Sequence, residues 1–286
     1  LDLHQALRSN RGIILNGKSR LQFGVENQIP ALRPISKGSI LPTAATEVVY
    51  AFEAMNLQAC QLEVYEIPAH KVQQHLQQND LQGNYELYRV ARPKVVRTLS
   101  LSATGQLALN RWNKFSVNLA DYLPIKAGAM YQVRIRFGRH QLLYPCKGAN
   151  AAEIPTDAET LERLNNAYDQ MYGDYWYEDG GWGEDDGWDW RQRDNPCNRA
   201  FYDEDRFLRT NILVSQLGVV AKRGNDGSTW IWVQQLGSTA AVEGAQVQLL
   251  DFQGNEIAAG ITNGDGLANL QPDGKPFLAV VQQGTD

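Results

Sequence analysis

Apolar and polar side chains alternate along much of this chain with a period of two, which is the pattern of β-strands with one buried face. One such run, residues 60–67, places Cys60, Leu62 and Val64 on one face and Gln61, Glu63 and Tyr65 on the other. Strands are predicted at 47–54, 60–67, 85–91, 94–102, 114–119 and 129–138, and at 211–220, 229–236, 245–251, 256–262, 266–270 and 277–283. Short strands at this spacing predict an all-β chain of tandem immunoglobulin/fibronectin-III-like β-sandwiches.

Two segments have a helical period instead. Val72 and Leu76 are spaced i, i+4, which predicts a brief helix at about 69–78. Thr156 and Glu159 form a capping box just after Pro155, and apolar residues then recur at helical spacing. A second helix is therefore predicted at about 156–171.

These elements divide the chain into four parts. Residues 1–32 are expected to be the tail of a preceding domain or the first strands. Residues 33–147 are predicted to form a first sandwich, and residues 148–204 a helix followed by an acidic insertion rich in Trp and Tyr. Residues 205–286 are predicted to form a second sandwich, expected to be truncated at its C-terminal end because one more strand would be needed.

Charge is concentrated in the insertion. The formal net charge is −5, but Tyr168–Trp190 holds eight acids and no base, so the remainder carries −5 − (−8) = +3. That remainder has no long Lys/Arg run, which argues against a nucleic-acid binder. No window approaches the roughly 18 consecutive apolar residues of a membrane span, so no spanning segment is expected.

The acidic insertion is the one candidate binding region. Exposed Trp beside carboxylates can stack on sugars or bind a cationic peptide. The candidate residues for such a loop are Trp176, Trp182, Asp185, Asp186, Trp188 and Trp190. A different interpretation is favoured, in which the aromatic side chains fold back as a plug between the two sandwiches. A calcium ion held by Asp185, Asp186 and Asp189 is a third, weaker option.

Three cysteines are present, and none lies in a C-x-x-C pair. Cys146 and Cys197 bracket the insertion, which suggests the hypothesis that they form a disulfide. Closing a loop of that length stabilises the folded state by roughly 4 kcal/mol in the chain-entropy model. Cys60 is expected to be a buried, unpaired core residue.

The remaining motifs favour ordinary turns over chemistry. Residues 12–19 fit the phosphate-binding pattern G-x-x-x-x-G-K-[ST], but a polar stretch precedes them and no helical pattern follows. Asn263-Gly264-Asp265-Gly266 lacks the closing Glu of a calcium loop. His4, His70, His75 and His140 are scattered. No catalytic residue, metal ligand or cofactor site is predicted.

Two long stretches resemble the N-terminal macroglobulin-like domains of the bacterial alpha-2-macroglobulin family. Together they cover most of residues 33–286, and the second runs from Ser215 to Leu270. The pieces that carry the first resemblance are Phe52-Glu53-Ala54-Met55-Asn56-Leu57, Leu76-Gln77-Gln78-Asn79, Gly128-Ala129-Met130-Tyr131-Gln132-Val133, Leu143-Tyr144-Pro145-Cys146 and Arg193-Asp194-Asn195-Pro196-Cys197. The last two pieces also fit the pairing of the two cysteines.

The resemblance implies an exported protein of the periplasm or cell envelope, its parent often a lipoprotein, that traps proteases after cleavage of a bait segment. In many members a Cys–Gln thioester then captures the protease. The thioester motif Cys-Gly-Glu-Gln is absent here, and no bait segment is identifiable. The chain is therefore expected to be a non-catalytic structural fragment whose partners are other domains of its parent and, through the parent, proteases. The alternative is a glycan- or peptide-binding module that uses the acidic Trp-rich loop.

Overall fold

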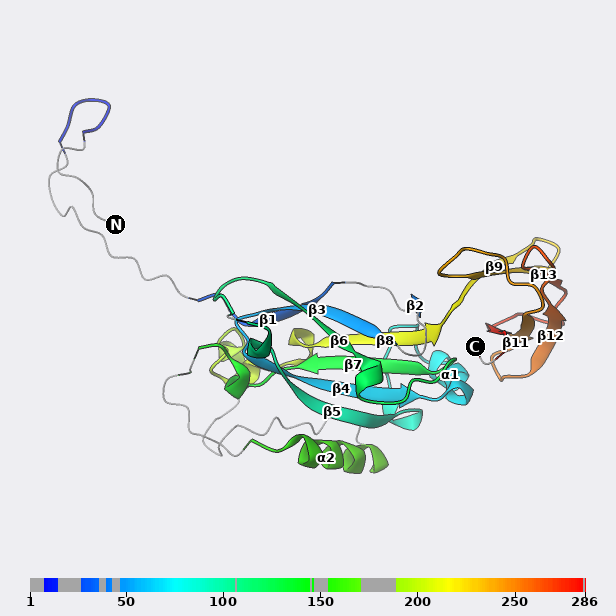
Figure 1. The fold of residues 1–286 in the computed structure, drawn as a ribbon, viewed down its shortest axis with the longest axis horizontal. Helices are drawn as coiled ribbons and strands as arrows, with labels where there is room; N and C mark the ends of the chain where they lie inside the picture. The colour runs from blue at the N-terminus through cyan, green and yellow to red at the C-terminus, as the bar shows by residue number, and fades with distance from the viewer. Residues whose placement is uncertain are drawn as a thin grey trace.

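The computed structural model describes residues 8–14, 27–35, 40–42, 47–105, 107–144, 146, 154–170, 189–284 and 286. These residues form two β-sandwiches, a larger one built from strands β1 to β8 and a smaller one built from β9 to β14 (Figure 1). The predicted all-β fold class is confirmed. No helix in the described part of the chain is long and apolar enough to cross a membrane.

The first sandwich pairs a three-stranded sheet with a five-stranded sheet. The smaller sheet has the order β1-β3-β6 and is antiparallel throughout. The larger sheet has the order β2-β8-β7-β4-β5, and its one parallel pair is β2 with β8. The bounds are β1 Ala31–Pro34, β2 Ile40–Pro42, β3 Val49–Met55, β4 Ala59–Ile67, β5 Arg92–Ser100, β6 Asn113–Asn118, β7 Met130–Arg136 and β8 Leu208–Ser215.

The core of this sandwich lies between the two sheets. Phe52 from β3 and Leu62 from β4 are fully buried there, and each large apolar side chain so buried stabilises the fold by about 1.5–3 kcal/mol. Tyr50 keeps its hydroxyl satisfied inside this core by a hydrogen bond with Thr210 across the sandwich, at 3.1 Å. Cys60 is a free, buried thiol as predicted, and burial raises its pKa to about 12.

Both predicted helices are confirmed within a few residues. Helix α1 spans Ala69–Leu76, and α2 spans Asp157–Asp169. The capping box starts α2: Thr156 Oγ1 accepts from the Glu159 amide, and the Glu159 carboxylate accepts from the Thr156 amide at 2.7 Å. The Thr156 amide and the Thr156 hydroxyl both donate to the Glu159 carboxylate, and these two bonds hold the pKa of Glu159 below its usual value. Helix α2 lies along β5, on the outer face of the larger sheet (Figure 1).

Two predicted strands are wrong. Residues 85–91 form a 3-10 turn, η1 (Leu87–Arg89), because Glu86 adopts a left-handed conformation with φ 49° and interrupts the extended run. Its apolar residues pack into a small cluster with Tyr65 and Tyr168 instead of joining a sheet. The run 211–220 is divided between β8 and β9 (Leu217–Arg223), which lie in different sheets.

The second sandwich consists of two antiparallel three-stranded sheets with the orders β13-β10-β9 and β12-β11-β14. Its remaining strands are β10 Thr229–Gln235, β11 Gln246–Leu250, β12 Glu256–Ile261, β13 Leu267–Leu270 and β14 Leu278–Gln282. The Asn263–Gly266 segment is a tight turn. Gly266 has φ +70°, and a Cβ there would lie 2.3 Å from the Val233 carbonyl oxygen.

The predicted start of the second sandwich at residue 205 needs correction, because β8 hydrogen-bonds to β7 in the first sandwich. We propose that the boundary lies at Gln216, between β8 and β9. Near this boundary the Gln216 amide donates to the Asp286 carboxylate at 2.6 Å. A second contact joins the sandwiches, since Gln77 at the end of α1 donates to the Phe252 carbonyl, also at 2.6 Å.

Candidate functional site

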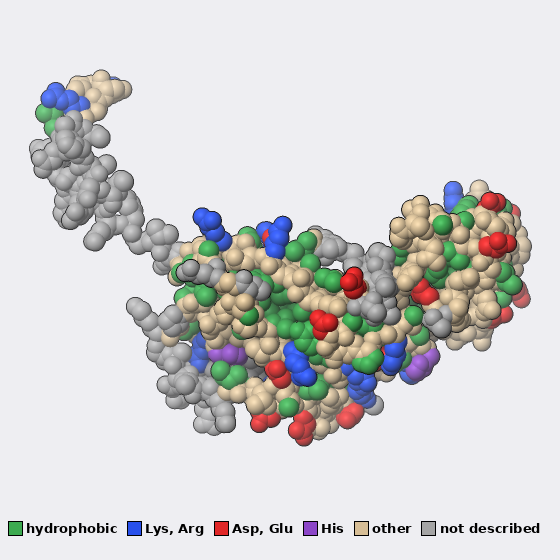
Figure 2. Space-filling view, viewed as in Figure 1, with side chains coloured by type: hydrophobic (Ala, Val, Ile, Leu, Met, Phe, Trp, Pro, Cys, Tyr) green, Lys and Arg blue, Asp and Glu red, His purple; other side chains and the backbone are tan. Residues whose placement is uncertain are grey.

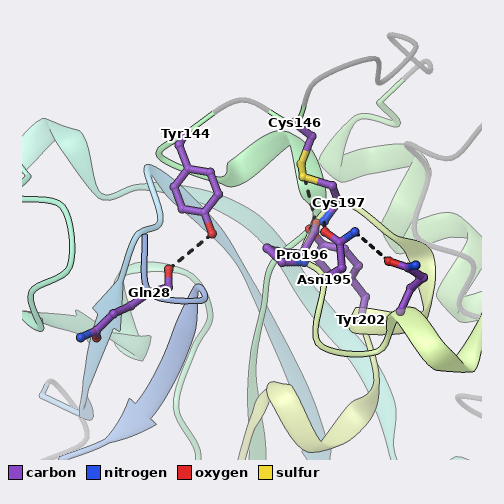
Figure 3. The surroundings of a disulfide bond; sticks show 8 residues. Gln28, Tyr144, Cys146, Asn195, Pro196, Cys197 and Tyr202 are labelled. Carbon is purple, nitrogen blue, oxygen red and sulfur yellow. Dashed lines mark hydrogen bonds between the residues drawn. A yellow bond between two sulfur atoms is a disulfide. The ribbon is translucent and has the colours of Figure 1, made fainter. Parts of the chain in front are cut away.

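A disulfide joins the two ends of the insertion, as predicted. Cys146 and Cys197 are bonded, with their Cα atoms 5.4 Å apart (Figure 3). Asn195 accepts a hydrogen bond from the Cys197 amide through its side chain at 3.0 Å, and Tyr202 donates to the Pro196 carbonyl at 2.6 Å. The bond therefore connects the segment that follows β7 to a short segment of defined conformation before β8.

The segment after the disulfide is held by side-chain caps and by aromatic packing. Asp189 and Asn198 each accept from an amide two residues ahead, which starts the 3-10 turns η6 (Trp190–Gln192) and η7 (Arg199–Phe201). Short polar side chains favour this local capping over regular structure. Phe201 is fully buried and meets Phe137 at a centroid distance of 6.3 Å. Loop residues with little sequence period are thus anchored in the sandwich core.

A pocket of about 380 Å³ lies between this segment and the start of β1. Trp190 lines it with 52% of its surface exposed, and the Arg193 guanidinium lies over the indole ring at 5.2 Å from the centroid. Asp203 and Asp205 line the same pocket. An exposed aromatic ring beside carboxylates and a guanidinium can stack on a sugar ring and bond its hydroxyl groups.

Arg206 fixes the geometry of this pocket. It donates to the Arg193 carbonyl at 3.0 Å and to the Asp194 carboxylate at 2.9 Å, and its guanidinium lies 4.2 Å from the Phe201 ring centroid. The planar guanidinium of Arg206 therefore connects the segment that carries Trp190 to the buried Phe201.

Of the six residues predicted for a binding loop, the structure places one. Trp176, Trp182, Asp185, Asp186 and Trp188 lie outside the described residues, whereas Trp190 lines the pocket beside β1. Trp190 does not lie between the two sandwiches, so the expected plug is wrong for this residue: its pocket is on the first sandwich alone. Asp189, a proposed calcium ligand, caps the Arg191 amide at 3.0 Å.

A buried polar layer on the outer face of the larger sheet was missed by sequence reasoning. Glu63 is fully buried and accepts from Tyr65 Oη at 2.8 Å. Arg134 lies over the Tyr65 ring and donates to Gln132, which donates in turn to Asn211 at 2.8 Å. Polar side chains on this face were available as a signal, but polarity alone is typical of a solvent-exposed face.

Helix α2 and the segment before β5 cover this layer. Tyr168 of α2 stacks on Tyr65 with ring centroids 5.4 Å apart. On the other side, Gln82 donates to the Asn211 carbonyl at 3.1 Å, and Asn211 donates to the Gly83 carbonyl at 2.7 Å. These hydrogen bonds and the ring contact join the layer to the two segments that cover the sheet.

The described residues contain no arrangement typical of a metal or nucleotide site. No group of three His, Cys, Asp or Glu side chains converges among them. His75 and His140 each have a pKa lowered by burial and lie on separate elements. In the nucleotide motif, Arg8 and Ile14 form an antiparallel bridge around a turn, and Ile13 is 69% exposed. Among residues 8–14, which the structure describes, there is no buried strand of the kind that a phosphate loop requires. Gly17-Lys18-Ser19 lie outside the described residues.

Comparison with known proteins gives a family-model match for the second sandwich. Residues 214–286 match the family model described as the bacterial alpha-2-macroglobulin MG3 domain. A 59-residue segment, 21% of this chain, is 37% identical to alpha-2-macroglobulin of Pasteurella multocida. That segment spans 3% of the length of the curated relative it matches.

Solved structures show a similar fold. Native Escherichia coli alpha-2-macroglobulin spanning domains NIE-MG1 has a TM-score of 0.50 at 17% identity, over 92% of this chain and 96% of that one. The fragment spanning MG0-NIE-MG1 has a TM-score of 0.53 at 16% identity, over 98% and 70%. At this identity the likeness shows the fold alone. The resemblance to bacterial alpha-2-macroglobulins is thus confirmed, in sequence for the second sandwich and in fold for both.

Proposed function

From this likeness to bacterial alpha-2-macroglobulin domains, we propose that the chain is a non-catalytic scaffold segment of a larger alpha-2-macroglobulin-like protein that traps proteases at the cell envelope. The match of residues 214–286 to the MG3 model carries the proposal. The architecture supports it, because two sandwiches in series suit a protein made of many such modules. The disulfide supports an exported location, since such bonds persist in oxidising compartments.

The scaffold role is tested with the parent protein and this chain in parallel. Each is mixed with an equimolar amount of a trypsin-like protease, and cleavage of a large protein substrate is followed. The parent is expected to suppress that cleavage, whereas the isolated chain is expected to have no effect. Inhibition or hydrolysis by the isolated chain, or no inhibition by the parent, would contradict the proposal. Fractionation of the producing cells tests the envelope location.

A second candidate is a glycan- or peptide-binding module, and the Trp190 pocket is the observation that favours it. Titration with oligosaccharides and cationic peptides, followed by Trp fluorescence, is expected to give saturable quenching that Trp190→Ala removes. Trp232→Ala is the matched control, because Trp232 is similarly exposed but lies on the second sandwich. Equal quenching in both variants would exclude the pocket.

A further inference from the structure

A second concave surface, the basic groove, lies at the end of the first sandwich near α1. It has a volume of about 670 Å³ and is lined by the cations Arg89, Arg92, Lys94 and Lys126. Its floor is made of small apolar side chains, among them Val90 and several alanines. In the space-filling view, Lys and Arg side chains gather beside α1 (Figure 2). The groove is separate from the Trp190 pocket, and no residue lines both.

Three of the four cations already bind carboxylates of this chain. Arg89 pairs with Glu86 at 2.9 Å, and Lys126 pairs with Glu66 at 2.6 Å. Arg92 pairs at 3.2 Å with Asp169, the last residue of α2. Carboxylates are therefore the groups that these side chains bind in this geometry.

The groove also offers positive charge that the described residues leave uncompensated. Lys94 is exposed and has no carboxylate partner among the described residues. The N-terminus of α1 opens into the groove through Ala69 and His70, its N-cap Pro68 has no side chain that can cap it, and the first turn carries no acid. An uncapped helix N-terminus attracts negative charge through its free amides.

We propose that the basic groove binds a carboxylate-rich peptide segment of a partner protein. The acidic side chains of the peptide pair with Lys94 and with the N-terminus of α1. The backbone and small side chains of the peptide lie on the alanine floor of the groove. Inorganic phosphate would leave most of a space of 670 Å³ empty and would not use that floor. A nucleic acid would need a longer basic track than four side chains supply.

The test measures binding of a fluorescently labelled peptide of alternating Glu and Ala residues, roughly 12 long, to the intact chain. Saturable binding is expected, and it should weaken by about tenfold or more when salt rises from about 0.05 M to about 0.5 M. Lys94→Glu should weaken binding by about tenfold or more, and Lys94→Gln by less. Neither change breaks an ion pair, so thermal unfolding should stay unchanged.

Lys222→Glu is the matched control, because Lys222 is an exposed lysine on β9 of the second sandwich. Absence of saturable binding, or equal weakening by Lys94→Glu and Lys222→Glu, would overturn the proposal. Displacement by inorganic phosphate with no peptide binding would also overturn it. So would peptide binding that is seen only after residues 171–188 are deleted, since the acidic stretch of the chain itself would then be the occupant.

Discussion

The central strands of the two sandwiches, β7 and β10, show opposite relations between polarity and exposure on their outer faces. In β7 that face carries Gln132, Arg134 and Arg136, and all three are buried. In β10 it carries Trp230 and Trp232, and Trp232 is 41% exposed. The polar face is therefore covered, and the aromatic face is open to solvent.

The difference arises from what lies above each sheet. The larger sandwich has α2 and the segment leading into β5 as a cover, and buried charges beneath it are paired with each other and with aromatic rings. The smaller sandwich has no such cover among its described residues. Alternation along a strand thus identifies its inner face. Whether the outer face is buried or exposed depends on segments elsewhere in the chain.

Removing the disulfide should have the largest effect. Replacing Cys146 and Cys197 by Ser is expected to destabilise the first sandwich by about 4 kcal/mol, because the unfolded chain regains the freedom of a long open loop. Hydrogen exchange measured by mass spectrometry should show faster exchange in β7 and unchanged exchange in β10, since the second sandwich contains no cysteine. Equal acceleration in both strands would contradict this expectation and would mean that the two sandwiches unfold together.

Glu63→Gln should have the next largest effect. It leaves the buried Arg136 without the acid that lies 3.8 Å away, and loss of one partner of a buried pair costs about 3 kcal/mol. Urea unfolding monitored by circular dichroism measures the loss. Glu243→Gln, at an exposed position of the second sandwich, is the control and should produce no comparable change. A similar loss of unfolding free energy in the two variants would mean that the charge of Glu63 does not stabilise the covered layer.

Thr156→Ala should weaken the cover itself. The variant loses the cap of α2, which typically costs about 1 kcal/mol, while leaving the buried layer chemically intact. Faster exchange of the α2 amides is the expected observation, with β10 again unchanged. If α2 exchanged at its original rate, packing through Tyr168 and Leu164 alone would suffice to hold the helix.

Trp232→Gln should have the smallest effect. The residue lies on an open face, and surface substitutions usually change stability by less than about 0.5 kcal/mol. The ring does contact Trp230, with centroids 6.3 Å apart, so a slight loss is expected in urea unfolding. A loss of several kcal/mol would show that this aromatic face is structurally required, and it would remove the contrast with β7.

Local signals predicted much of the fold. The capping box at Thr156 and Glu159 started α2 at the expected residue, and the period-two runs of β3, β4 and β7 identified the core. The break at Ser215–Gln216 was missed because only these two polar residues, neither of them Gly or Pro, separate the apolar residues on either side. The strand expected at 85–91 failed because its apolar side chains serve the cover of the sheet.

The candidate site was less accessible to sequence reasoning. Bracketing of the insertion by Cys146 and Cys197 was enough to suggest their pairing. The Trp190 pocket could not be predicted in this way, because it also needs Pro30 and Leu32, which lie more than a hundred residues earlier in the sequence. The basic groove likewise combines the three cations of residues 89–94 with Lys126, which is distant from them in sequence. Surfaces assembled from distant segments have no local pattern to detect.

The bond between Cys146 and Cys197 has a topological consequence. It closes the intervening residues into a covalent ring, with the first strands on one side and β8 with the whole second sandwich on the other. Hydrolysis of any one peptide bond within that ring would yield two polypeptides that still migrate together in a denaturing gel. They would part only after reduction, so a cut at that place would leave the two sandwiches joined.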